Sequence, residues 1–149
     1  MKELHMDNRK DLIREFTRSF RHLIRSVRQD FAVEFENYIP FNEFTLLRVL
    51  EDDKTLRVSD VAKRINSTNS YVTLTSDKLV KKGYIIRERS ELDRRTVYLT
   101  LTDEGYELVK KMDEIVDAYF NKTFSDISNE EMKLVIGIVG KIKTNKKDA

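Results

Sequence analysis

Short polar side chains crowd the segment from residue 68 onward, and basic side chains follow them up to residue 95. Hydroxyl and amide groups can hydrogen-bond to base edges and phosphates, whereas ammonium and guanidinium groups bind phosphates or enter a narrow minor groove. This combination predicts a surface that binds double-stranded DNA. We expect that surface to contain Thr68, Asn69, Ser70, Thr73, Lys78, Lys81, Arg89, Arg94 and Arg95.

An acidic residue, Asp93, stands directly before Arg94 and Arg95. A carboxylate in that place can orient a neighbouring arginine through a charge-assisted hydrogen bond. The plainer interpretation is an exposed salt bridge within a loop, which would stabilise little.

The pattern around these residues predicts the elements that position them. A short helix at about 59–65, a polar turn and a helix at about 69–82 form a helix-turn-helix unit, with Thr68 as N-cap and Gly83 as a left-handed C-cap. Strands at 84–89 and 96–101 then form a hairpin whose loop, 90–95, should project. We expect the second helix and the hairpin to face the core through Val72, Ser76, Leu79, Val80, Ile86, Val97, Leu99 and Leu101.

Four helices flank this unit. Residues 8–37 carry one apolar stripe about seven turns long, and Pro40 should end that helix. Asn42 should cap the next helix, whose expected buried face is Phe44, Leu47, Val49 and Leu50. Two C-terminal helices follow, the last opened by a capping box of Ser128 and Glu131.

The end helices are more apolar than one small domain needs, which predicts a homodimer. The expected organisation is a helical dimerisation region at 1–38 and 103–149, with a winged helix-turn-helix DNA-binding domain at 39–102. The expected fold class is mainly α with a small β-hairpin wing.

Two features of the first helix have open interpretations. Its arginine row is either a solvated face or an electrostatic fringe that faces DNA or an acidic ligand; the row is Arg14, Arg18, Arg21, Arg25 and Arg28. A set of aromatic residues is either plain core or the lining of a pocket for a small aromatic or anionic ligand; the set is Phe16, Phe20, Tyr38, Phe41 and Phe44.

Charge and composition narrow the function classes. Residues 54–101 contain 11 Lys and Arg against 5 Asp and Glu, a local charge of +6, so the remainder carries −4. A basic centre on an acidic scaffold favours a polyanion as partner. The chain has no Cys, and its two histidines, His5 and His22, form no cluster. We therefore expect no metal site, no cofactor and no catalytic residues.

The sequence also bears on localisation. No apolar run approaches the roughly 18 residues of a membrane span, so we expect no membrane partner. The first ten residues lack the apolar region of a signal peptide. The expectation is a cytoplasmic protein.

An ordered set of motifs resembles the MarR family of bacterial transcription regulators. It comprises Phe41-Asn42-Glu43-Phe44 to Leu50, Val61-Ala62, Val72-Thr73, Leu79 to Gly83, Asp93-Arg94-Arg95 and Leu101-Thr102-Asp103-Glu104-Gly105. The resemblance implies a winged-helix dimer that binds palindromic operators and, in many members, a ligand cleft beside the dimerisation helices. It places Asn69, Ser70, Thr73 and Lys78 on the recognition helix and Arg94 or Arg95 in the minor groove. Where many members have Arg after the recognition-helix Thr, this chain has Leu74.

The resulting hypothesis is a homodimeric, sequence-specific DNA-binding transcription regulator. We expect it to act as a repressor on a pseudo-palindromic operator, with release by a small ligand as an added possibility. The alternative is a dimeric winged-helix module that binds proteins without specific DNA binding. Nothing in the sequence favours an enzyme, because no nucleophile–base pair and no phosphate-cradling glycine loop is present.

Overall fold

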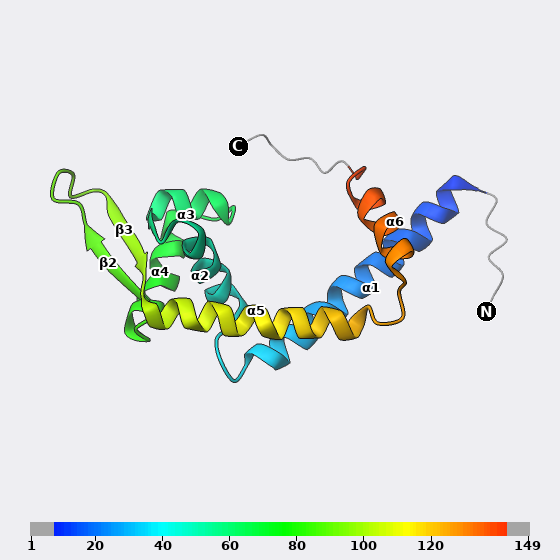
Figure 1. The fold of residues 1–149 in the computed structure, drawn as a ribbon. Coiled ribbons are helices and arrows are strands. Elements are labelled where there is room, and N and C mark those ends of the chain that lie inside the picture. Colours follow the sequence, from blue (N-terminus) through cyan, green and yellow to red (C-terminus); the bar gives the residue numbers. More distant parts are fainter. Residues whose placement is uncertain (1–7, 143–149) are drawn as a thin grey trace. The chain divides into compact units, whose positions relative to one another are not determined.

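The computed structural model describes residues 8–142 and divides the chain into two compact units, one ending at Phe41 and one beginning at Asn42. The first unit consists mainly of helix α1 (Arg9–Phe35) (Figure 1). Asn8 caps it, its side chain accepting a hydrogen bond from the Lys10 backbone N–H at 3.1 Å. Because α1 already ends at Phe35, the prediction that Pro40 ends it is wrong; a turn at 36–38 closes the helix instead.

Helix α2 (Phe41–Asp53) starts directly after Pro40. Asn42 therefore lies in the first turn, and its predicted role as N-cap is wrong because the helix begins one residue earlier. Glu43 and four apolar residues are buried, namely Phe44, Leu46, Leu47 and Leu50. Leu46 takes the place that the sequence assigned to Val49, which is only half-buried.

Strand β1 (Thr55–Arg57) follows, and after it come helices α3 (Val58–Arg64) and α4 (Asn69–Lys81). The two helices form the predicted helix-turn-helix unit, which together with the hairpin that follows is called the reading unit below. The Thr68 hydroxyl accepts a hydrogen bond from the Tyr71 backbone N–H at 3.2 Å, so the predicted cap is confirmed. The buried face of α4 is Val72, Thr75, Ser76 and Leu79, at helical spacing. Val80, predicted to be buried, is 38% exposed because Thr75 completes that face instead.

A three-stranded antiparallel sheet has the order β1-β3-β2, with β2 at Ile85–Arg89 and β3 at Val97–Leu101. The prediction that Ile86 faces the core is wrong, since Ile86 is 49% exposed and Ile85 is buried. Ile85 is paired with the buried Leu101, so the inward face of β2 begins one residue earlier than expected. The β2–β3 hairpin extends away from α3 and α4 (Figure 1).

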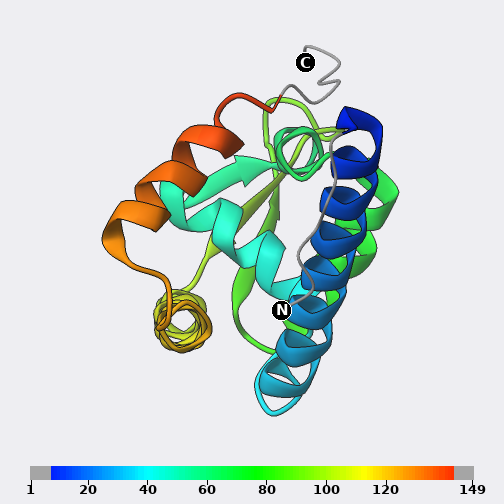
Figure 2. The same cartoon turned by 90° about the vertical axis from the view of Figure 1, so that its right-hand side faces the viewer.

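Helix α5 (Asp103–Thr123) forms one continuous coil, seen almost end-on in Figure 2, and helix α6 (Asn129–Val139) follows it. An ion pair between Arg48 and Asp113 links α2 to α5. The predicted capping box of α6 is present, and the backbone N–H of Ser128 lowers the pKa of the Glu131 carboxyl. No residue of α6 is buried. Among residues 8–142, no helix is both long and apolar enough to cross a membrane.

The segments around Gly83 and Gly105 meet closely, and we call this contact the Gly83–Gly105 junction. Gly83 has φ +80°, as expected for a left-handed cap. The Thr102 hydroxyl donates to the Gly83 carbonyl oxygen at 2.8 Å, and the Thr102 N–H donates to the Tyr84 carbonyl oxygen at 3.1 Å. A Cβ on Gly105 would lie 2.2 Å from that same Tyr84 oxygen. The backbones of the hairpin and of α5 can therefore approach only because residue 105 has no side chain.

The junction predicts the effect of Gly105→Ala. The new methyl group would overlap a backbone carbonyl that cannot move without breaking the Thr102 hydrogen bond. We expect a loss of about 2 kcal/mol or more in the free energy of unfolding, measured by urea denaturation. The control is Glu107→Ala on the exposed side of the same helix, which should change it by less than about 0.5 kcal/mol. Equal stability of the two variants would contradict the close contact.

Candidate nucleic-acid interface

The short polar residues at the start of α4 lie on two faces of the helix, one exposed and one buried. Thr68, Asn69 and Ser70 are exposed and Thr73 is half-buried, so their polar groups are accessible at the start of the helix. Thr75 and Ser76, in contrast, are buried, and the Ser76 hydroxyl donates to the Thr73 carbonyl oxygen at 2.8 Å. Only the exposed face can contact a partner, and it lies beside the backbone N–H groups at the positive end of the helix dipole.

A hollow of about 260 Å³ lies between the start of α4 and the sheet. Its lining combines two residues predicted on the helix, Asn69 and Thr73, with Arg95 from the wing. The other lining residues are Arg57, Val58, Ser59, Arg87, Thr96 and Val97. The fold thus brings Asn69, Thr73 and Arg95 to one concave, basic surface, which we call the α4–wing hollow. The other predicted residues do not line it; they are Thr68, Ser70, Lys78, Lys81, Arg89 and Arg94.

Two of its arginines, Arg57 and Arg87, were not among the predicted residues. Arg57 ends β1 and is paired with Tyr98 in β3, and its guanidinium carbon lies 5.9 Å from the centre of the Tyr98 ring. A hydrogen bond with Tyr98 raises the pKa of Arg57, with a smaller contribution from Asp60. Arg57 could not be placed from the sequence because its position depends on the pairing of β1 with β3. The only signal for Arg87 is its spacing of two from Arg89.

Arg87 also connects the sheet to the helix. Its guanidinium lies 2.5 Å from the Asp77 carboxylate on α4, and its side chain is 29% exposed. The pair neutralises the one acidic residue of α4 and fixes the helix against β2. Further along α4, Lys78 and Lys81 are exposed, as predicted for side chains that hold a DNA backbone. Lys82 instead pairs with the buried Glu43 of α2 at 2.6 Å.

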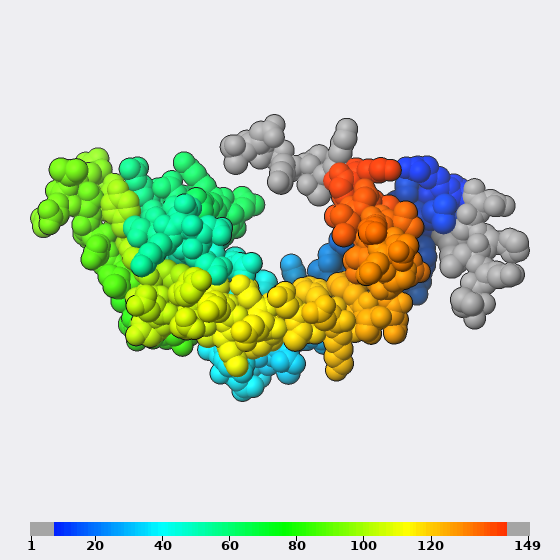
Figure 3. Space-filling model, in the orientation of Figure 1, coloured from blue at the N-terminus to red at the C-terminus, as the bar shows by residue number. Residues whose placement is uncertain are grey.

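The tip of the wing, residues 90–96, is organised by its own hydrogen bonds. Asp93 accepts from the Arg95 backbone N–H at 3.0 Å and from the Thr96 hydroxyl at 3.2 Å. The carboxylate therefore acts on the backbone that carries the arginines, whereas the sequence suggested contact with a guanidinium. Arg94, Arg95 and Arg89 are all exposed, the last at the end of β2. The hairpin region projects at one end of the second unit (Figure 3).

The predicted ligand pocket would need aromatic residues from both units, so each unit is described separately. Within the first unit, the Phe16 and Phe20 rings stack at 5.8 Å, and the Phe31, Phe35 and Phe41 rings stack on one another at 5.3–6.2 Å. Phe16, Phe20, Tyr38 and Phe41 are exposed, whereas Phe44, in the second unit, is buried. The pocket itself stays a prediction.

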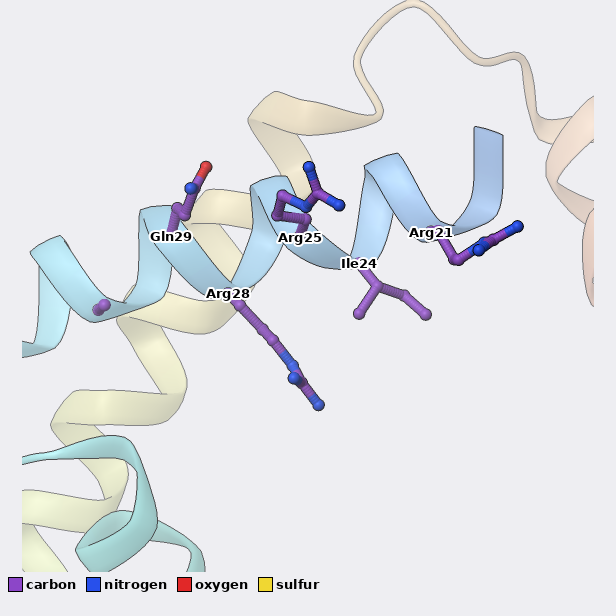
Figure 4. A pocket seen from close by; sticks show the side chains of 6 residues that line it. Arg21, Ile24, Arg25, Arg28 and Gln29 are labelled. Atoms are coloured by element: carbon purple, nitrogen blue, oxygen red, sulfur yellow. The ribbon is translucent and has the colours of Figure 1, made fainter. Parts of the chain in front are cut away.

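Three members of the arginine row of α1, Arg21, Arg25 and Arg28, line a shallow hollow of about 400 Å³. The other lining residues are Ile24, Gln29 and Ala32. None of the five predicted aromatic residues is among them. The guanidinium groups of Arg25 and Arg28 point away from each other (Figure 4), so they do not converge on one anion. In the part of the chain that the structure describes, no three His, Cys, Asp or Glu side chains gather as a metal site would require.

Comparison with known proteins places this geometry in a family. The MarR family model matches residues 39–97. The HTH-type transcriptional repressor MdtR of Bacillus subtilis is 32% identical over 114 residues, covering 74% of this chain and 71% of that protein. The structure of the YusO protein from the same organism is similar at a TM-score of 0.75 with 27% identity, over 90% of this chain and 96% of that one.

A third comparison includes DNA. The structure of the Staphylococcus aureus MepR–DNA complex is 25% identical to this chain at a TM-score of 0.72, over 85% of this chain and 94% of that one. The sequence match, the winged-helix fold and the basic surface all point to the same family. The chain belongs to the MarR family of winged-helix transcriptional regulators.

Proposed function

We propose that this protein is a homodimeric transcriptional repressor that binds a pseudo-palindromic operator through the α4–wing hollow and the side chains around it. The observation that carries the proposal is the meeting of Asn69 and Thr73 from α4 with Arg95 from the wing on one surface that also holds Arg57 and Arg87. Helix and hairpin in this arrangement match the major groove and the neighbouring minor groove of one duplex.

The surface suggests a division of roles. The exposed groups at the start of α4, from Thr68 to Thr73, contact base edges and the nearest phosphates. Lys78 and Lys81, further along the helix, hold the sugar–phosphate backbone. Arg94 and Arg95 enter the minor groove from the tip that Asp93 shapes, and Arg89 contacts phosphate at the base of that tip.

Dimerisation is supported by apolar side chains that the single chain leaves exposed. In α1, Ile13, Phe16, Phe20 and Leu23 are between 43% and 54% exposed. In α6, Leu134, Ile136, Ile138 and Val139 are between 54% and 67% exposed. Exposed apolar residues in such number are typical of an interface. A second copy would place two reading surfaces on half-sites about one helical turn apart.

The wing provides the first test. In the double variant Arg94→Ala plus Arg95→Ala, we expect affinity for a selected operator duplex to fall about tenfold or more, because each guanidinium contact contributes about 1 kcal/mol or more. The affinity should also fall less steeply as the salt concentration rises, because binding displaces fewer cations from the DNA. Mobility shifts at several salt concentrations measure both.

The matched control is Glu91→Ala, which removes an acidic side chain from the same exposed tip. That variant should bind at least as well as the unaltered protein. Unchanged binding by the double arginine variant would contradict the role of the wing.

The dimer has a test of its own. Ile138→Glu places a charge on the exposed apolar face of α6, and we expect it to shift the protein toward monomer in sedimentation equilibrium, because burying an unpaired carboxylate is costly. Lys133→Glu introduces the same side chain at an exposed polar position of the same helix. This variant should keep the dimer mass measured by sedimentation equilibrium. A monomeric unaltered protein at micromolar concentration would contradict the proposal.

Two finer points stay predictions from the sequence: repression, as opposed to activation, and release of DNA by a small aromatic or anionic ligand. The alternative function, a dimeric module that binds proteins only, is less well supported. It gives no reason for three arginines, Arg57, Arg87 and Arg95, to line the hollow at the start of α4.

A further inference from the structure

One apolar side chain stands on the outward face of the recognition helix. Leu74 lies two residues from both Val72 and Ser76, hence about 200° around α4 from each of these buried residues. Its side chain is 66% exposed, compared with 37% for Tyr71 and 38% for Val80, the other exposed large hydrophobic residues of α4. Leu74 therefore contributes little to the core of the reading unit.

The neighbours of Leu74 on that face are polar or charged. Ser70 precedes it by one turn and Lys78 follows it by one turn, and both are exposed. Asp77, also nearby, is neutralised by Arg87 at 2.5 Å. Leu74 is thus the one position in the middle of this face that offers neither a hydrogen-bonding group nor a charge.

The edges of the base pairs in the major groove are almost entirely hydrogen-bond donors and acceptors. The exception is the C5-methyl group of thymine, the one apolar feature in the groove. A leucine placed against a donor or acceptor would desolvate it without a partner, which costs free energy. Against a thymine methyl, the same side chain buries apolar surface from both partners.

From this geometry we infer that Leu74 is a specificity-determining residue that selects thymine in each half-site by contact with its C5-methyl group. The inference rests on the proposed DNA-binding function. It adds a base preference that the hydrogen-bonding residues Asn69, Ser70 and Thr73 do not explain.

The test uses deoxyuridine, which differs from thymidine only by that methyl group. Duplexes are first selected from a random library with the full-length protein, and each thymine of the selected sequence is then replaced singly by deoxyuridine. At one thymine in each half-site we expect about a fourfold rise in Kd, measured by fluorescence anisotropy, because one buried methyl is worth about 0.8 kcal/mol. In Leu74→Ala the same replacement should leave Kd unchanged.

Leu92→Ala is the matched control, because it removes the same side chain from a fully exposed position in the wing. Its uracil penalty should equal that of the unaltered protein, whatever its overall affinity. A second variant, Leu74→Arg, should select guanine in place of that thymine, because arginine pairs with the two major-groove acceptors of guanine. Neither change at residue 74 should alter the thermal unfolding midpoint much, given its exposure.

The outcomes separate the two proposals. If the selection enriches no sequence, the proposed function fails and the inference with it. If a sequence is enriched but every uracil penalty is the same with Leu74 and with Ala at that position, the inference alone is overturned. A penalty that disappears only in Leu74→Ala supports both.

Discussion

The contact between Gly105 and the Tyr84 carbonyl oxygen is the constraint on which the arrangement of the reading unit depends. It joins the end of α4, the start of β2, the end of β3 and the start of α5 within a few residues. Thr102 serves this junction twice, since its hydroxyl donates to Gly83 and also accepts from the Gly105 N–H at 3.0 Å. Because both strands of the hairpin are anchored here, the wing has a fixed direction relative to α4.

A second connection, the ion pair of Asp77 with Arg87, joins α4 to the middle of β2. Together the two connections hold α4 against the base and the middle of the hairpin. In the proposed complex, this arrangement would set the base contacts of α4 and the minor-groove contacts of the wing together. The pair also removes the repulsion that Asp77 would exert on a phosphate. The cation–π contact of Arg57 with Tyr98 similarly holds a positive charge beside the hollow. In the proposed complex with DNA, a surface that is already formed in this way would need little ordering of side chains on binding.

Much of this fold could be predicted from local signals. The caps at Thr68 and Ser128, the left-handed Gly83 and the inward face of Leu99 and Leu101 each depend on neighbours in sequence, and each is confirmed. Two errors occurred near the ends of elements. Helix α2 starts at Phe41, two residues before the start that a cap at Asn42 implies. The pairing of Ile85 with Leu101 puts Ile85, and not Ile86, on the buried face of β2.

The candidate site was predictable in part. Asn69, Thr73 and Arg95 carry their signal in the polar helix start and the charged loop, and the structure brings all three to one hollow. Arg57 reaches the same hollow through the register of β1 with β3, and Arg87 through an ion pair between β2 and the neighbouring helix α4. Such contacts depend on tertiary structure, so residue type and spacing did not reveal them. The predicted aromatic pocket failed to gain support for a related reason, because it requires the two units to be placed together.

In the proposed complex, the start of α4 and the wing tip form the surface that meets DNA. Backbone amide chemical shifts, followed while the selected duplex is titrated into the protein, test it most directly. We expect the largest changes in residues 68–74 and 90–97, with much smaller changes for a shuffled duplex of the same composition. Changes centred on the arginine row of α1, with the α4–wing hollow unaffected, would contradict it.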